Sequence, residues 1–160
     1  MQLPPEDGAT FAENALGKAR AAARATGQPA IADDSGIEAD ALSGAPGIRS
    51  ARYAGERAGD GENLAKLIEQ VPPGSGLRYV CVIAFADPSS GEELTVEGTL
   101  AGTMAAAPAG VGGFGYDPVF LPEGGDGRTT VAELDDAGKD AISHRGRAAR
   151  LLAERLAARG

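Results

Sequence analysis

The feature that most constrains the fold is an uncharged run at residues 79–86, Tyr-Val-Cys-Val-Ile-Ala-Phe-Ala, which is followed at once by a turn sequence. A short run this rich in β-branched and aromatic residues predicts a buried strand over residues 78–86. Residues 87–91, Asp-Pro-Ser-Ser-Gly, predict a hairpin turn, and the alternating residues 92–99 predict the partner strand. Core packing accounts for both strands without any functional role.

Helical patterns lie on either side of this hairpin. Thr10 and Glu13 fit a capping box and predict a helix over residues 11–26, which Gly27 ends. Apolar residues at helical spacing predict a second helix over residues 63–71. A short helix is predicted at residues 130–134, and Ser143 is a suitable N-cap for a last helix. The apolar face of that last helix is expected to contain Ala148, Leu151, Leu152 and Leu156.

Residues 29–37, Pro-Ala-Ile-Ala-Asp-Asp-Ser-Gly-Ile, place two adjacent carboxylates after a short apolar run. Ile31 and Ala32 predict a strand and Ser35-Gly36 a turn, and residues 37–42 alternate like another strand. Asp33 and Asp34 are then expected on opposite faces, because strand side chains alternate. Two neighbouring carboxylates repel each other unless a cation or water compensates them. The pair therefore indicates either a Mg²⁺ site or a solvated acidic turn.

Composition and charge exclude several classes of protein. The 160 residues suit a single domain, and the formal charge of −8, from 15 basic and 23 acidic residues, argues against nucleic acid as a partner. The amino end lacks the basic and apolar regions of a signal peptide, and the longest apolar run is too short for a membrane span. A single cysteine, Cys81, is expected to be buried and reduced, which favours the cytoplasm.

The densest glycine region is residues 98–121, expected to be a loop, in which Gly110 to Gly115 spell G-x-G-x-x-G. A dinucleotide site needs a strand before this motif and a helix after it, and Pro108 and the segment 116–120 provide neither. The loop carries two of the chain's seven aromatic residues, Phe114 and Tyr116. The rings either stack on a planar base or fold into the core.

Near the carboxyl end, Lys139, His144 and Arg145 collect around the expected start of the last helix. Cations in a first helical turn are disfavoured by the helix dipole unless an anion is also present. The three side chains and the free amides of the helix start therefore indicate a site for a phosphate or a purine oxygen, and the alternative is that His144, the only histidine, has a structural role.

Several of these segments together resemble the inosine triphosphatase or Ham1-like family of purine nucleoside triphosphate pyrophosphatases. The strings that match are at residues 10–15 with Lys18 and Ala19, 32–36, 46–53, 112–118 and 143–146. The resemblance implies an α/β fold in which helices flank an elongated mixed central β-sheet, with two lobes and a cleft. It also implies a homodimer and Mg²⁺-dependent hydrolysis of ITP, dITP and XTP to the monophosphate and pyrophosphate, which cleans the nucleotide pool.

The resemblance also implies roles for individual residues. Asp34 resembles the general base and a metal ligand, and Glu6 a second metal ligand. The implied substrate contacts are Ser35, Phe114, Gly115, Tyr116, Asp117, Lys139, His144 and Arg145.

One part of the family pattern is missing. Relatives begin with a strand, a Thr/Ser-x-Asn-x-x-Lys phosphate-binding turn and a helix, whereas here Met1 lies just before the motif at Thr10. Either the natural start lies upstream of Met1, or the chain is a shortened paralogue. We expect residues 1–160 to form one pyrophosphatase domain that is shortened at its amino end relative to the family, with weaker triphosphate affinity than full-length relatives.

Two other functions fit parts of the sequence. A non-catalytic purine-nucleotide binder would keep the base pocket and the carboxylates without turnover. Asp34-Ser35-Gly36 also fits the nucleus of an aspartic protease, but that chemistry needs two such loops and the chain has one.

Overall fold

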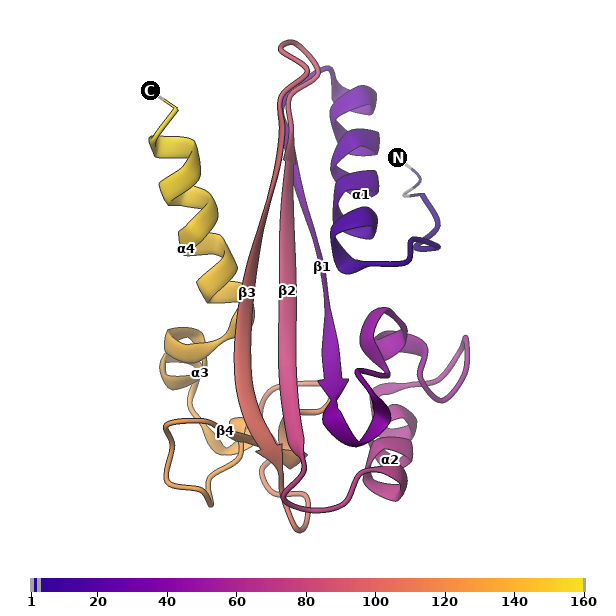
Figure 1. The fold of residues 1–160 in the computed structure, drawn as a ribbon, viewed down its shortest axis with the longest axis vertical. Coiled ribbons are helices and arrows are strands. Elements are labelled where there is room, and N and C mark those ends of the chain that lie inside the picture. The colour runs from indigo at the N-terminus through magenta and orange to yellow at the C-terminus, as the bar shows by residue number, and fades with distance from the viewer. Residues whose placement is uncertain (1, 3, 160) are drawn as a thin grey trace. The chain divides into compact units, whose positions relative to one another are not determined.

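The computed structural model describes residues 2 and 4–159 and has an α/β fold, as expected (Figure 1). Its helices are α1 (Phe11–Thr26), α2 (Asp60–Gln70), α3 (Asp136–Ile142) and α4 (His144–Ala157). Its strands are β1 (Ala30–Ala39), β2 (Gly76–Ala86), β3 (Glu93–Met104) and β4 (Phe120–Pro122). Short 3-10 helices occur at Asp40–Leu42, Gly47–Arg52, Asp117–Val119 and Val131–Glu133.

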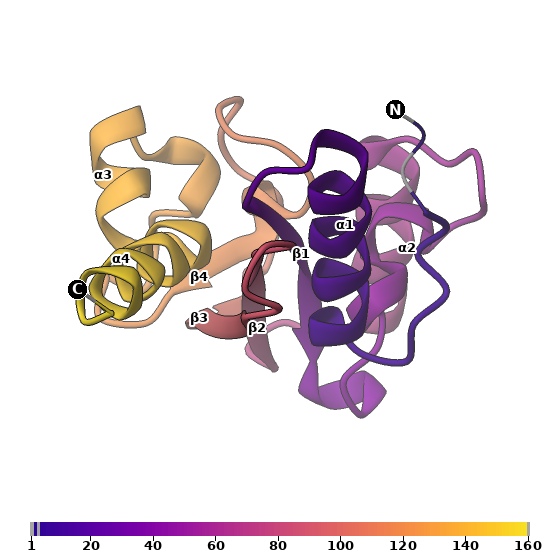
Figure 2. The ribbon, with the colours of Figure 1, turned by 90° about the horizontal axis from the view of Figure 1, so that it is seen from above.

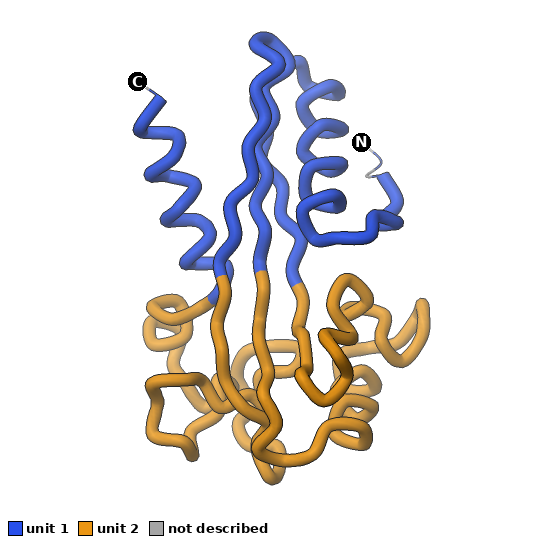
Figure 3. Tube along the Cα trace, in the orientation of Figure 1, with its two compact units in different colours: residues 1–35, 81–98, 144–160 blue, residues 36–80, 99–143 orange. Residues whose placement is uncertain are grey.

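The four strands form one sheet in the order β1-β2-β3-β4. The hairpin predicted between residues 87 and 91 is present, and the Asp87 amide donates to the Glu92 carbonyl across it. β3 pairs with β4 in antiparallel register, with Gly102 opposite Pro122 and Met104 opposite Phe120. The chain divides into two compact units, which Figure 3 colours separately. Unit 1 contains residues 1–35, 81–98 and 144–160, and unit 2 contains residues 36–80 and 99–143.

Unit 1 is built from α1, α4 and the adjoining parts of β1, β2 and β3. Figure 2 shows α1 and α4 on opposite sides of these strands, which explains why residues 81–86 of β2 are all buried. Alternate residues of β2 pack with α4, in a cluster made of Cys81, Ile83, Phe85, Val96, Ala148 and Leu152. Leu151, which we expected on this apolar face, is 42% exposed.

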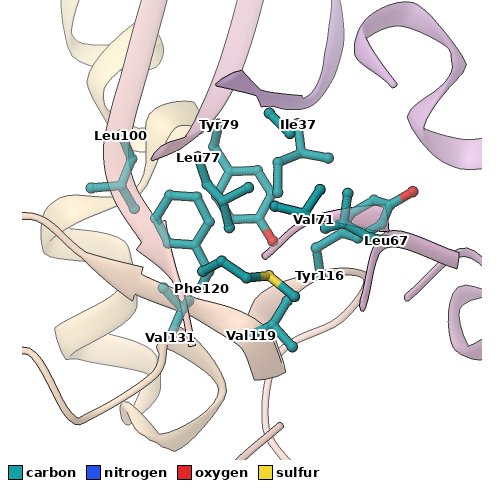
Figure 4. Close-up of a cluster of buried hydrophobic side chains, with 12 residues drawn as sticks. Ile37, Leu67, Val71, Leu77, Tyr79, Leu100, Tyr116, Val119, Phe120 and Val131 are labelled. Atoms are coloured by element: carbon teal, nitrogen blue, oxygen red, sulfur yellow. The ribbon is translucent and has the colours of Figure 1, made fainter. Parts of the chain in front are cut away.

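Unit 2 has its own core, shown in Figure 4. The cluster is formed by Ile37, Ala39, Leu67, Val71, Leu77, Tyr79, Leu100, Met104, Tyr116, Val119, Phe120 and Val131. At its centre the rings of Tyr79 and Phe120 stack with centroids 4.5 Å apart. Because side chains from β1, α2, β2, β3 and the segment 116–131 all enter this core, it fixes the end of the glycine-rich loop.

Helix α1 confirms the sequence prediction at both ends. The Thr10 hydroxyl accepts from the Glu13 amide at 3.1 Å, and Gly27 ends the helix in a left-handed conformation. The Glu13 carboxylate reaches back to the amide of Ala9 at 2.7 Å. Helix α2 begins at Asp60, three residues earlier than predicted, and α3 was not predicted. Helix α4 begins directly after Ser143, as expected.

Strand β1 corrects the prediction for residues 29–42. The chain does not turn at Ser35-Gly36, and one strand continues from Ala30 to Ala39. Sheet pairing keeps the backbone extended, and the buried side chains of Ile37 and Ala39 anchor the second half of the strand. The two aspartates therefore lie in the middle of a strand.

Strand β3 corrects the expected loop over residues 98–121, because it continues to Met104 and includes Gly98 and Gly102. Both glycines lie close to neighbouring backbone, Gly98 to the start of α4 and Gly102 to the paired strand β4. A Cβ at Gly98 would be 2.2 Å from the His144 carbonyl oxygen, and one at Gly102 would be 2.3 Å from the Leu121 carbonyl oxygen. The two glycines thus allow close approach of neighbouring backbone rather than loop flexibility.

Within the part of the chain that the structure describes, no helix combines the length and the apolar composition required to cross a membrane. Cys81 is a free and buried thiol, as predicted. Burial raises its pKa to about 11.

Candidate functional site

Asp34 is the nearly buried carboxylate of a polar cluster in unit 1, and its side chain points toward α1. Its Oδ2 accepts from the Asn14 side-chain amide at 3.0 Å, and its Oδ1 lies 3.5 Å from the Lys18 ammonium. Lys18 also donates to Glu6 at 2.7 Å. We call Glu6, Asn14, Lys18 and Asp34 the carboxylate cluster.

Asn14 orients Asp34 because both ends of its amide are held. Asn14 is 5% exposed, and its Oδ1 accepts from the Gly8 amide at 2.8 Å while its Nδ2 donates to Asp34. A Cβ at Gly8 would lie 2.6 Å from that Oδ1, so only glycine permits this close approach. Oδ2 of Asp34 is therefore fixed, and Oδ1 is left to face the cation.

The electrostatics of the carboxylate cluster depend on how far each group is buried. Burial raises the pKa of Asp34, and the charge of Glu6 adds to this, whereas Asn14 and Lys18 oppose it. For Lys18, burial acts to lower the pKa, but the bond to Glu6 and the charge of Asp34 outweigh it and raise the pKa. Glu6 and Asp34 thus share one positive charge.

The donor set of this cluster fits a magnesium ion. Mg²⁺ in nucleotide sites is commonly held by one or two carboxylates, with substrate phosphates and water completing its shell. No group of three or more His, Cys, Asp or Glu side chains in residues 2 and 4–159 is arranged to hold a metal by itself. Glu6 and Asp34 supply two carboxylates that already share the Lys18 ammonium. They therefore match the type of Mg²⁺ site in which substrate phosphates and water complete the coordination.

Asp33 lies on the other face of β1, as strand alternation predicts. Its Oδ2 accepts from Nη2 of Arg145 at 2.8 Å, at the start of α4. The buried thiol of Cys81 lies 4.0 Å from the same oxygen. Ser35 is two residues further along β1 and so faces the same side as Asp33. The adjacent aspartates therefore contact different helices.

In unit 2 the glycine-rich loop separates the two aromatic residues that the sequence singled out. Phe114 is 64% exposed, whereas Tyr116 is buried and its hydroxyl donates to the Ser50 carbonyl at 2.6 Å. The sequence left two alternatives for these rings. Tyr116 lies in the core, whereas Phe114 is exposed and could stack on a base. The Gly115 amide donates to Asp60 at 3.0 Å.

Asp117 holds this loop in place through its buried carboxylate. Its carboxylate is 2% exposed and accepts from the Tyr79 hydroxyl at 2.7 Å, from the Phe114 amide at 3.0 Å and from Lys139 at 2.5 Å. The Lys139 ammonium also lies 4.1 Å from the centre of the Phe114 ring. Lys139 and Phe114 are thereby brought together, although 25 residues separate them in the sequence.

A shallow pocket of about 230 Å³ lies beside this loop in unit 2. Its lining is Asp60, Gly61, Leu64, Gly110, Val111, Gly112, Gly113, Phe114, Gly115 and Pro118. Loop residues supply most of that lining, so the same glycines that let Phe114 face outward also form the pocket.

Sequence reasoning assigned no role to Asn14 or Lys18, and it considered Asp33 only together with Asp34 as a possible Mg²⁺ site. Asn14 and Lys18 are four residues apart on α1 and so share one helix face, which is a signal that the sequence does contain. The pairing of Asp33 with Arg145 spans 112 positions and carries no local signal.

Comparisons with known proteins show the family of this chain. The model of the Ham1 family matches residues 1–155. A dITP/XTP pyrophosphatase of Nocardia farcinica is 52% identical over 158 residues, which cover 96% of this chain and 75% of that protein. One from Streptomyces coelicolor is 54% identical over 151 residues, covering 92% and 74%. The structure of the Staphylococcus aureus Ham1 protein superimposes with a TM-score of 0.89 at 40% identity, covering 100% of this chain and 82% of that one.

Proposed function

The chain belongs to the Ham1 family, and on this premise we propose that it hydrolyses the non-standard purine nucleoside triphosphates ITP, dITP and XTP. The products are the nucleoside monophosphate and pyrophosphate, so the activity would clean the nucleotide pool. The observation that carries the proposal is the carboxylate cluster, in which a nearly buried Asp34 shares a cation with Glu6. The names of the relatives from Nocardia farcinica and Streptomyces coelicolor support the substrate class.

Asp34 is the proposed general base. Water attacks the α-phosphorus, the bond from that phosphorus to the oxygen bridging to the β-phosphate breaks, and pyrophosphate leaves. Asn14 holds Oδ2 of Asp34, so Oδ1 is the oxygen placed to accept the proton of the attacking water. Because burial raises the Asp34 pKa, its basicity is greater than that of a solvated aspartate.

Glu6 and Asp34 are the proposed ligands of Mg²⁺. When bound, the ion neutralises charge on the phosphates and on the leaving pyrophosphate. Lys18 contacts both carboxylates. When Mg²⁺ is bound to Glu6 and Asp34 instead, the Lys18 ammonium is placed to contact phosphate oxygens. Removal of divalent metal with EDTA should abolish pyrophosphate release, and added Mg²⁺ should restore it.

The proposed contacts to the nucleoside are Ser35, Phe114, Gly115, Tyr116, Asp117, Lys139, His144 and Arg145. Phe114 offers an exposed ring face for stacking, and Asp117 holds the amide of Phe114 and the ammonium of Lys139 in place. Arg145 carries donors that suit a 6-oxo group. An adenine amino group would leave such donors unpaired, at a cost of about 1–3 kcal/mol for each buried group.

The test is pyrophosphate release from ITP, dITP, XTP, GTP and ATP in the presence of Mg²⁺. We expect release from ITP, dITP and XTP, and its loss in the Asp34→Asn variant. Glu93→Gln is the matched control, since Glu93 also forms an ion pair, with Arg20 on the surface of unit 1. Binding without turnover would instead support the non-catalytic purine-nucleotide binder. Equal cleavage of GTP and ATP would contradict the proposed specificity.

We also propose that the protein works as a cytoplasmic homodimer, as the family resemblance implies. The buried, reduced Cys81 suits a reducing compartment. Light scattering coupled to size-exclusion chromatography should give a mass near twice the 16.1 kDa of one chain.

A further inference from the structure

The ion pair between Asp33 and Arg145 is not used by the carboxylate cluster, although Asp33 is the immediate neighbour of Asp34. The two side chains meet at 2.8 Å on the face of β1 that α4 covers. Asp34 points to the opposite face, where it contacts α1. One strand therefore presents a carboxylate to each helix.

The start of α4 needs a negative charge that the helix itself does not provide. Its first turn contains basic side chains and no acidic residue. The positive end of the helix dipole disfavours Arg145 there unless an anion lies close by. Asp33 is that anion, and it comes from β1 rather than from α4.

The backbone of α4 at this point is fixed against β3. A Cβ on Gly98 would lie 2.2 Å from the His144 carbonyl oxygen and 2.4 Å from the Ala148 amide nitrogen. No side chain therefore separates the helix start from the strand. With the backbone fixed by Gly98, the orientation of the Arg145 side chain depends on its partners, which are the Asp33 carboxylate at 2.8 Å and the buried Cys81 thiol. Of the two, only Asp33 carries a charge opposite to that of the guanidinium.

We propose that Asp33 is a positioning residue that holds the Arg145 guanidinium ready to bind the oxygen atoms of a 6-oxo purine. This inference rests on the proposed function. A guanidinium carries five N–H donors, and the bond to Asp33 uses one on Nη2. Other donors of the group then keep a fixed orientation, and Ser35 lies on the same face of β1. Asp34 carries the hydrolytic chemistry, and Asp33 acts through Arg145 on substrate affinity.

The first test separates substrate binding from turnover. The Asp33→Asn variant should raise the KM for ITP about 5- to 10-fold, as expected for loss of a charge-assisted hydrogen bond, and leave kcat within about 2-fold. Asp33→Glu should recover part of the lost affinity, because the carboxylate is retained. Glu93→Gln, which breaks a carboxylate–guanidinium pair elsewhere in unit 1, should change neither constant.

A double-mutant cycle then tests whether Asp33 acts through Arg145. In an Arg145→Met background, Asp33→Asn should produce no further rise in KM. Additive effects would overturn the proposal. So would a fall in kcat at unchanged KM, because that result would mean that Asp33 acts on Asp34.

Binding of inosine monophosphate, measured by calorimetry, gives a readout that needs no catalysis. Wild-type protein should bind it more tightly than Asp33→Asn, and this difference should vanish in the Arg145→Met background. If the wild type releases no pyrophosphate, the proposed hydrolysis fails, yet the calorimetric cycle still decides the role of Asp33. Equal affinity of wild type and Asp33→Asn would overturn that role even in an active enzyme.

Discussion

Gly98→Ala should destabilise unit 1 by forcing α4 away from β3. The new methyl group would lie 2.2 Å from the His144 carbonyl oxygen and 2.4 Å from the Ala148 amide nitrogen, both of which are backbone atoms. Ordinary van der Waals contact begins near 3.4 Å, so the helix start must move by about 1.2 Å. Overpacking of this kind costs about 1–3 kcal/mol.

Gly17→Ala is a matched control with the opposite sign. Gly17 lies inside α1, and a Cβ there would meet nothing within 4 Å. Replacing an interior helical glycine by alanine stabilises by roughly 0.5–1 kcal/mol, because the unfolded chain loses freedom and the helix gains propensity. The same chemical change should therefore lower stability at one site and raise it at the other.

Thermal denaturation followed by circular dichroism measures both effects. At about 2–4 °C per kcal/mol for a chain of this length, Gly98→Ala should lower Tm by roughly 2–12 °C and Gly17→Ala should raise it by roughly 1–4 °C. Gly98→Ala should also raise the KM for ITP, because Arg145 moves with the helix start. An unchanged Tm in Gly98→Ala would refute the close packing of α4 on β3.

Three other variants test the candidate site. Asp34→Asn should abolish pyrophosphate release. Because burial raises the pKa of Asp34, its ionised form opposes folding, and the variant should have a higher Tm than wild type at pH 8. This difference in Tm should disappear as the pH is lowered and Asp34 becomes protonated. Ser50→Ala removes the acceptor of the Ile37 amide, 2.8 Å away, and should cost about 1–3 kcal/mol in urea denaturation. Lys139→Met leaves the buried Asp117 carboxylate without its cation and should cost about 2–3 kcal/mol, part of which a second change, Asp117→Asn, should restore; a neutral Lys139→Met would contradict the buried pair.

Local signals in the sequence were enough for α1 and for the hairpin. The capping residue Thr10 and the end at Gly27 act within a few positions of the chain, so their prediction needed no tertiary context. The same holds for the strand at residues 79–86, because a continuous apolar run of this kind is favourable only when it is buried in the interior. Alternation along β1 also placed Asp33 and Asp34 on opposite faces, because that inference needs only the two-residue period of a strand.

Tertiary contacts decided the remaining features. Ser35-Gly36 has the composition of a turn, but pairing within the sheet keeps it extended. Gly98 and Gly102 look like loop residues in sequence, but both lie in β3, where the backbone of His144 and of Leu121 leaves no room for a Cβ.

The candidate site shows the same division between local and long-range information. The sequence predicted Asp34 as a site residue, and the four-residue spacing of Asn14 and Lys18 already indicates that they share one face of α1. Only the folded chain showed that Phe114 faces outward while Tyr116 enters the core, and that Asp33 meets Arg145 across 112 positions. The physical reason is range: caps, turns and strand alternation act between near neighbours, whereas burial and ion pairing depend on which distant segments the fold brings together.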